Sequence, residues 1–142
     1  MIQILSGIQN TTAALQAEQT RLDVISENIA NANTTHGVDG KPYQRQVVVF
    51  ESALQQQMSG GSASQMPSLR VARIESDQRP PVQIYDPGNP EADEQGMVSM
   101  PNVNIHEEMA DLISASRTFE ADLAVVKNSR SMAMETLAIG KH

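Results

Sequence analysis

Apolar side chains recur at helical spacing at both ends of this 142-residue chain, and this periodicity limits the possible folds more than any other feature. In the N-terminal segment one apolar row has seven-residue spacing and a second row adjoins it: Ile8, Leu15, Leu22 and Ile29, then Ile4, Ile25 and Ala32. Residues 4–31 contain no proline, and polar residues fill the other positions, as in an amphipathic helix. The spacing predicts a long helix that ends near Asn31, before Gly37 and Gly40.

A stronger pattern lies in the C-terminal segment, where ten positions advance in steps of four and three residues: Ile105, Met109, Leu112, Ser116, Phe119, Leu123, Val126, Arg130, Ala133 and Leu137. Asn104 followed three residues later by Glu107 fits a capping box. Glu108 and Asp111 also fall where the positive end of a helix dipole favours acids. We predict a helix from Ile105 to Ile139, which would be about 50 Å long.

Two long helices at opposite ends of a chain can pair as an antiparallel coiled coil that brings the termini together. The expected fold is therefore mainly α with a small β-rich insertion. Its segments are an N-terminal helix in residues 1–33, a middle module in residues 34–102 and a C-terminal helix in residues 103–142. Ser116 and Arg130 interrupt the apolar row, so either a stable helical hairpin or packing completed by neighbouring copies fits the pattern.

The middle module combines short runs of β-branched residues with turn-forming residues. The runs predict strands at Tyr43–Ser52, Leu69–Glu75 and Val82–Tyr85. By composition, Met58–Ser64 is a flexible loop, and Asp86–Asp93 is an irregular excursion rich in proline and glycine.

Composition excludes several classes of protein. Ten basic residues against seventeen acidic ones give a net charge of −7, which repels phosphate backbones and argues against nucleic acid as a partner. Cysteine is absent, so disulfides, thiolate catalysis and cysteine-based zinc sites are excluded. The longest apolar runs, such as Val47–Phe50 and Leu123–Val126, hold four residues, so no membrane insertion is expected. Because no basic residue precedes Arg21, ordinary signal-peptide rules predict a cytoplasmic chain.

No group of residues has the spacing of a catalytic or metal site. A zinc protease would need a second histidine at Ala110, four residues after His106. The His36, Asp39 and Gly40 group offers too few oxygens for calcium and is better interpreted as a turn. A looser acidic group is interpreted as solvated surface: Asp86, Glu91, Asp93 and Glu94. We therefore expect no enzyme activity, no cofactor and no metal.

Specific strings resemble a known family. Residues 22–35, LDVISENIANANTT, are similar to the signature that closes the first helix of flagellar rod and hook axial proteins. The strings DGKPYQRQ at residues 39–46, YDPGNPEAD at 85–93 and PNV at 101–103 resemble the proximal rod members of that family. SASRTFEA at residues 114–121 matches in order and spacing. The signature residues are Ser26, Asn28, Ile29, Ala30, Asn31, Pro42, Tyr43, Pro87, Pro90, Pro101 and Asn102. Met97, Phe119 and Asp122 depart from the family pattern.

The resemblance implies a structural subunit of the flagellar basal-body rod, which spans the periplasm. Such a subunit would assemble helically with itself and other rod proteins, transmit motor torque to the hook and line the export channel. It would leave the cell through the flagellar type III export apparatus without a cleavable signal peptide, which overrides the cytoplasmic expectation. The alternative is a cytoplasmic export adaptor or chaperone for axial proteins.

The two predicted helices supply the expected packing residues. These are Ile8, Leu15, Leu22, Ile25, Ile29, Met109, Leu112, Phe119, Leu123, Val126 and Leu137. They would pack within or between subunits.

Overall fold

The computed structural model describes residues 2–37, 39–53 and 68–139. Its elements in chain order are α1 (Ile2–Ala30), β1 (Gln46–Ala53), β2 (Ser68–Ser76), β3 (Val82–Tyr85), β4 (Met97–Met100) and α2 (Ile105–Ile139). The expectation of two terminal helices around a small strand-rich middle is confirmed.

The ends of α2 lie where the sequence predicts them. Asn104 is the residue before the helix, and its Oδ1 accepts a hydrogen bond from the backbone N–H of His106 at 3.1 Å. Its amide nitrogen also contacts Glu107 Oε1 at 3.3 Å. The side chains of Asn104 and Glu107 therefore bond to each other. In a capping box, each of them would instead bond to the backbone N–H of the other residue.

The four strands form two separate antiparallel pairs, β1 with β2 and β3 with β4. The β1–β2 register pairs Gln46 with Ser76 and shifts between Val49 and Phe50. The three predicted strands are confirmed, whereas β4 was not predicted because a four-residue run with one β-branched residue gives little signal. The predicted flexible loop Met58–Ser64 lies outside the described residues.

The loop from Asp86 to Gly96 is a series of turns closed by short hydrogen bonds. Asp93 Oδ1 accepts from the backbone N–H groups of Gln95 and Met97. Gly96 has φ of 76°, and a Cβ there would lie 3.0 Å from the Tyr85 ring. The irregular excursion predicted for Asp86–Asp93 is thus an ordered connection between β3 and β4.

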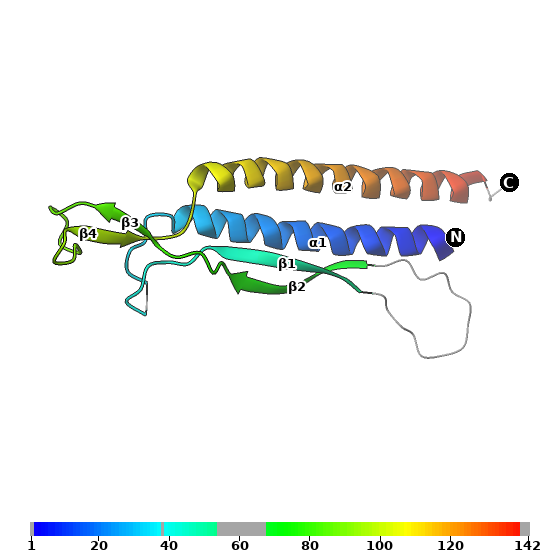
Figure 1. The fold of residues 1–142 in the computed structure, drawn as a ribbon. Helices are drawn as coiled ribbons and strands as arrows, with labels where there is room; N and C mark the ends of the chain where they lie inside the picture. Colours follow the sequence, from blue (N-terminus) through cyan, green and yellow to red (C-terminus); the bar gives the residue numbers. More distant parts are fainter. Residues whose placement is uncertain (1, 38, 54–67, 140–142) are drawn as a thin grey trace.

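Helix α1 lies between two layers, with α2 on one side and the β1–β2 pair on the other (Figure 1). This position explains why most of the buried apolar residues belong to α1 or follow it directly: Ala17, Val24, Ile25 and Ala32. The β3–β4 pair lies beyond the end at which α1 finishes and α2 begins (Figure 1). Neither helix carries an apolar stretch long enough to cross a bilayer.

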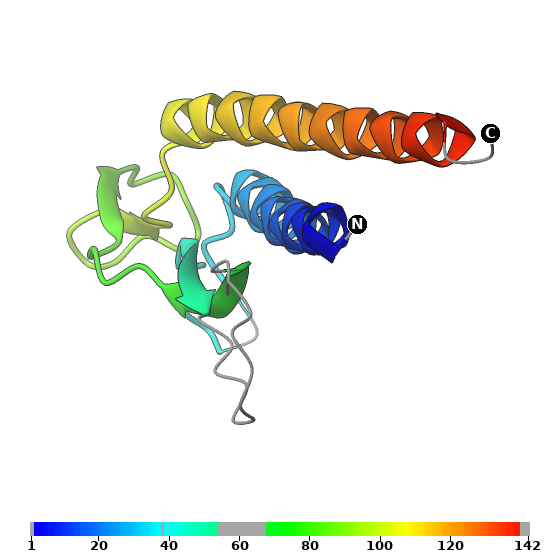
Figure 2. The same ribbon diagram turned by 90° about the vertical axis from the view of Figure 1, so that its right-hand side faces the viewer.

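The two helices run in opposite directions but do not stay side by side. Figure 2 shows that they are closest where α1 ends and α2 begins, and that they diverge toward the two termini. Of the described α2 residues, Glu108 and Ala115 are buried. Continuous coiled-coil pairing is therefore not confirmed.

The face of α2 that packs on α1 differs by one residue from the predicted row. Eight of the ten less exposed positions again advance in steps of four and three: Glu108, Leu112, Ala115, Phe119, Asp122, Val126, Ser129 and Ala133. The other two, Asp111 and Ser116, lie next to this row. Leu112, Phe119, Val126 and Ala133 belong to both rows. Met109, Leu123 and Leu137 are instead 52%, 46% and 56% exposed, because polar or small residues take the inward positions beside them.

We expect the Asn104→Ala variant to lose about 1 kcal/mol of stability, because it removes the side-chain acceptor for the first turn of α2. Denaturant unfolding followed by circular dichroism measures this loss. Asn128→Ala, in the middle of α2 and exposed, is the matched control and should not destabilise, since alanine is the better helix former. Equal losses in the two variants would contradict the cap.

Candidate functional site

The described polar side chain with the most bonds belongs to Asn28, in the last turns of α1 and 1% exposed. Its amide nitrogen donates to the carbonyl oxygen of Gln46 at 2.9 Å and to Glu108 Oε2 at 3.0 Å. Its oxygen accepts from the backbone N–H of Gln46 at 2.8 Å and from the Tyr43 hydroxyl at 3.0 Å. An asparagine side chain has two N–H donors and one oxygen with two lone pairs, so Asn28 is fully satisfied.

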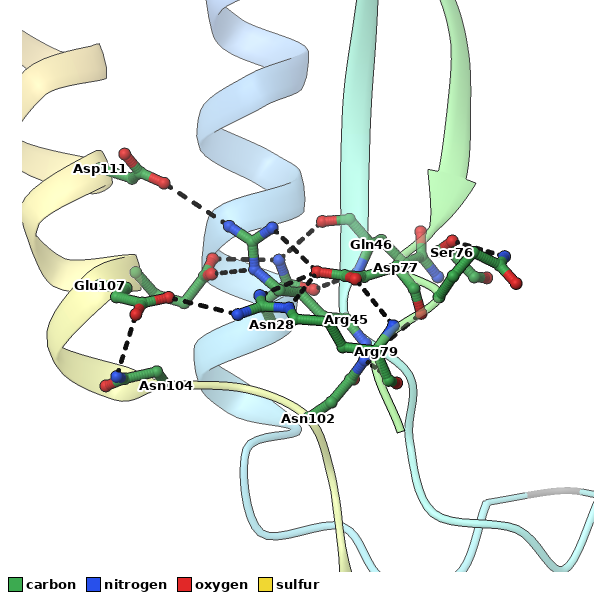
Figure 3. A network of polar contacts seen from close by, with 12 residues as sticks. Asn28, Arg45, Gln46, Ser76, Asp77, Arg79, Asn102, Asn104, Glu107 and Asp111 are labelled. Atoms are coloured by element: carbon green, nitrogen blue, oxygen red, sulfur yellow. Dashed lines mark hydrogen bonds and ion pairs between the residues drawn. The ribbon is translucent and has the colours of Figure 1, made fainter. Parts of the chain in front are cut away.

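Glu108 is a fully buried carboxylate on the first turn of α2. Besides the bond from Asn28, its Oε1 accepts from Arg45 Nε at 2.6 Å. Arg45 also lies 3.6 Å from Asp77 on one side and 3.6 Å from Asp111 on the other. Figure 3 shows the Arg45 guanidinium between α1, α2 and the strands.

Asn102 extends this network to the segment before α2. Its Oδ1 accepts from the backbone N–H of Arg45 at 2.8 Å, and its nitrogen donates to the Arg79 carbonyl oxygen at 2.8 Å. Arg79 in turn donates to Asp77, and this bond lowers the pKa of the Asp77 carboxyl. We call the set Asn28, Tyr43, Arg45, Asp77, Asn102 and Glu108 the polar clamp.

Among the residues of the polar clamp, Tyr43 has a strongly shifted pKa. Burial, followed by the negative charges of Glu27 and Glu108, raises its pKa from 10.0 to about 12. Between pH 10 and pH 12 the unfolded chain loses this proton while the folded chain keeps it. Folding stability from this group is therefore complete below pH 10 and decreases as the pH rises toward 12.

The chemistry of the polar clamp is structural. Each charged member is bonded to a partner of opposite charge or to backbone groups. In the described ranges, no three histidine, aspartate or glutamate side chains gather as metal ligands. The clamp instead joins four separate segments of the chain, which fixes how α1, α2 and the two strand pairs meet.

The structure brings part of the predicted family signature into this clamp. Asn28, Tyr43 and Asn102 are members of it. Ile29 is half-buried, Pro101 is buried beside Asn102, and Pro42 is half-buried next to Tyr43. The remaining signature residues lie outside it, mostly exposed, in the end of α1 or in the β3–β4 loop: Ser26, Ala30, Asn31, Pro87 and Pro90.

The predicted packing residues separate into two groups. Ile25 is buried, and six others are half-buried, namely Leu15, Leu22, Ile29, Leu112, Phe119 and Val126. Met109, Leu123 and Leu137 are exposed. The side chain of Ile8 lies outside the described residues. Whether these residues form contacts between subunits remains a prediction.

Sequence reasoning missed Arg45 and Glu108 as site residues. Glu108 was interpreted as an acid at the positive end of the helix dipole, and Arg45 was quoted as part of a family string without a role. One signal was available: Glu108 lies four residues before Leu112 and seven before Ala115, on the face that packs. A carboxylate on a packing face needs a buried cation or amide as partner.

Beside the polar clamp lies an open cleft of about 270 Å³ between α1, β1 and the first turns of α2. Its apolar walls come from Val24, Ile25, Val47, Val48 and Phe50. Its polar rim carries Arg21 and Asp111, whose side chains approach to 3.9 Å. The clamp residues Asn28, Arg45 and Glu108 also line it, so the cleft combines apolar and charged lining side chains.

The other candidate groups from the sequence are structural turns. The His36, Asp39 and Gly40 region turns tightly, with the Gly37 N–H donating to the Lys41 carbonyl oxygen and Gly40 at a φ of 69°. His36 Nδ1 lies 3.1 Å from Glu91 Oε1, so one acid of the loose group is paired. The Thr35 hydroxyl, and then His36, lower the pKa of Glu91.

Comparisons with known proteins agree with one another. A family model described as "Flagella basal body rod protein" matches residues 8–37, and one described as "Flagellar basal body rod FlgEFG protein C-terminal" matches residues 94–139. The flagellar basal-body rod protein FlgC of Yersinia enterocolitica is 42% identical over 91% of this chain and 92% of its own. The FlgC proteins of Borreliella burgdorferi and Bacillus subtilis are 40% and 38% identical, over 96% and 92% of this chain and 97% and 94% of their own.

We expect the Glu108→Ala variant to be destabilised by about 3–5 kcal/mol, because it leaves Arg45 without its buried partner and Asn28 with an unpaired donor. The midpoint of denaturant unfolding measures the effect. Glu120→Ala changes an exposed glutamate farther along α2 and should leave the midpoint nearly unchanged. Similar midpoints for both variants would show that the clamp does not stabilise the fold.

Tyr43 should ionise at unusually high pH. In a Tyr85→Phe variant, Tyr43 is the single remaining tyrosine, so tyrosinate absorbance reports on it alone. The folded variant should titrate near pH 12, and the same chain in denaturant near pH 10. A titration at pH 10 under both conditions would contradict the burial of the Tyr43 hydroxyl against Asn28.

Proposed function

Because the chain belongs to the FlgC family of flagellar basal-body rod proteins and is a structural subunit of the rod, we propose that it assembles helically with itself and other rod proteins to transmit motor torque to the hook. The terminal helices, residues 1–33 and 103–142, form the inner layer that lines the export channel. The middle module, residues 34–102, forms an outer layer against adjacent subunits.

One observation carries this proposal: several large apolar residues of α2 face away from α1. Met109, Leu123, Met134 and Leu137 are all about half exposed or more. Burying one side chain of this size contributes about 1.5–3 kcal/mol. A row of such residues along one side of a helix is the kind of surface that protein partners cover. Assembly would therefore remove from water the apolar groups that folding of the single chain leaves exposed.

The sequence also left a cytoplasmic export adaptor or chaperone as an alternative. The comparisons give it no support, because the matched relatives are named as rod proteins. The rod family is a structural family and not an enzyme family, and we propose that this chain has no catalytic activity, cofactor or metal of its own. We also propose that it binds no nucleic acid and does not insert directly into a membrane.

The family is a flagellar basal-body family, and we propose that this chain occupies the part of the rod that spans the periplasm. It would reach that position through the flagellar type III export apparatus. The divergence of the helices in Figure 2 supports a chain whose final packing is completed by neighbours after export.

Mass spectrometry of detergent-washed hook–basal bodies from cells that make this chain tests the rod assignment. The chain should remain in the rod fraction, in amounts comparable with other rod subunits. Its absence there, with abundance in the cytoplasm of cells that build complete flagella, would overturn the proposal.

Leu123→Asp should block rod assembly while the isolated chain keeps its fold. Leu123 is 46% exposed in the single chain, so aspartate is tolerated there, but in an interface it would bury an unpaired charge. Circular dichroism of the purified variant and electron microscopy of hook–basal bodies provide the two readouts. Leu123→Met, which conserves volume and apolarity, is the control and should assemble. Complete rods built from the aspartate variant would exclude Leu123 from the interface.

A further inference from the structure

The charged residues that line the cleft balance one another, but carboxylates next to the lining leave an excess of negative charge around it. Arg21 lies within ion-pair distance of Glu18 and Asp111. Arg45 is shared among Asp77, Glu108 and Asp111, and Arg79 pairs with Asp77 and Glu107. Three guanidinium groups are thus divided among five carboxylates, and the Asp111 side chain remains 44% exposed at the rim. A cation brought to this rim would find charge that the chain itself does not neutralise.

Glu18 shows this deficit most clearly. The residue is 7% exposed, and its Oε2 is buried without a hydrogen-bond partner in the described part of the chain. Arg21 Nη1 lies 3.7 Å away, which is longer than a hydrogen bond. A buried carboxylate oxygen without a donor is unfavourable, so a further donor would stabilise this region.

The second half of α2 presents a matching surface. Leu123, Lys127, Arg130, Met134 and Leu137 are all exposed and advance in steps of four and three residues. They therefore lie along one side of the helix, and we call them the outer stripe. Within residues 2–37, 39–53 and 68–139, no carboxylate lies within ion-pair distance of Lys127 or Arg130. The outer stripe thus combines three large apolar groups with two unpaired cations.

The outer stripe cannot reach the cleft of its own chain. Asp111 marks the cleft on α2, and residues 123–137 lie roughly 18 to 39 Å farther along the same helix axis. Figure 2 shows that this part of α2 runs away from the β1–β2 pair and from the end of α1. Only another molecule can bring an outer stripe to this cleft.

We propose that the cleft between α1, β1 and the start of α2 receives the outer stripe of α2 from a second copy of this chain. The apolar groups of the stripe enter between Ile25, Val48 and Phe50, and Lys127 and Arg130 approach Asp111, the exposed carboxylate at the rim. This inference rests on the proposed rod function and names the partner of the exposed side of α2.

The contact joins two different surfaces, so it is heterologous. Each copy then offers a free cleft at one side and a free stripe at the other, and repeated addition gives an open, helical row of subunits. The apolar walls and the charge at the rim select the partner. They also fix the position of the stripe along the cleft, since a shifted stripe would place like charges next to each other at the rim.

Cysteine cross-linking in assembled rods tests the proposal, because the natural chain contains no cysteine. Val48→Cys in the cleft is combined in turn with Leu123→Cys, Lys127→Cys and Met134→Cys, and isolated hook–basal bodies are oxidised. At least one pair should yield a ladder of covalent oligomers of this chain. Val125→Cys and Met132→Cys, each two residues from a stripe position and exposed on another side of α2, should give no ladder with Val48→Cys.

The outcomes separate this inference from the rod function. Rods that contain the variants but give no ladder with any stripe position would overturn the cleft contact and leave the rod assignment intact. A cross-link from Val48→Cys to a different rod protein, identified by mass spectrometry, would likewise overturn the second copy as the occupant. Absence of even the natural chain from the rod fraction would overturn the rod function itself.

Charge reversal gives an independent readout of the rim contacts. Lys127→Glu together with Arg130→Glu should lower the cross-linking yield about tenfold or more, because both substitutions place like charge against the rim. Arg117→Glu reverses an exposed cation of α2 that lies outside the stripe and should leave the yield unchanged. An unchanged yield in the double variant would show that the rim carboxylates do not select the partner.

Discussion

The buried contact of Glu108 with Arg45 and Asn28 is the interaction on which the rest of the structure depends. It joins the start of α2 to the end of α1 and to the residues that lead into β1. Removing two charges from water is unfavourable by itself, and apolar groups of similar shape would often stabilise a fold as well or better. What the ionic contact adds is geometry: a slide of α2 by one turn would leave Glu108 without partners and would remove one bond each from Arg45 and Asn28. The polar clamp therefore sets the register of the helices.

The apolar contacts reinforce this register only near the clamp. Ile25 and Ala115 are buried there, while the second half of α2 leaves α1 (Figure 2). Four aromatic residues and no tryptophan give the chain few large groups for a core. The single chain is consequently held most firmly at one end of the helix pair, and its least supported part is the long arm of α2.

The helices could be predicted closely because their signals are local. The capping residues Asn104 and Glu107 and the apolar spacing each involve residues only a few positions apart. Helix α2 begins and ends where these signals predict. The exact packing face could not be predicted, since Leu112 and Phe119 belong to both the predicted and the observed rows.

The polar clamp could not be predicted for a different reason. Asn28 and Glu108 are 80 residues apart, and no sequence pattern shows that the chain brings them together. The family string contained Asn28 and Asn102 without showing what they bind.

The division of α2 into two neighbouring rows links folding to assembly. The inward row combines Glu108, Ala115, Asp122 and Ser129 with a few larger residues, so it fixes position but buries little apolar surface. The adjacent row carries Met109, Leu123 and Leu137, which remain in contact with water. If these larger residues faced α1, the single chain would be more stable, but little hydrophobic free energy would remain for association. Keeping them outside leaves that free energy for contacts between subunits, while the polar clamp ensures that each subunit presents them in the same orientation.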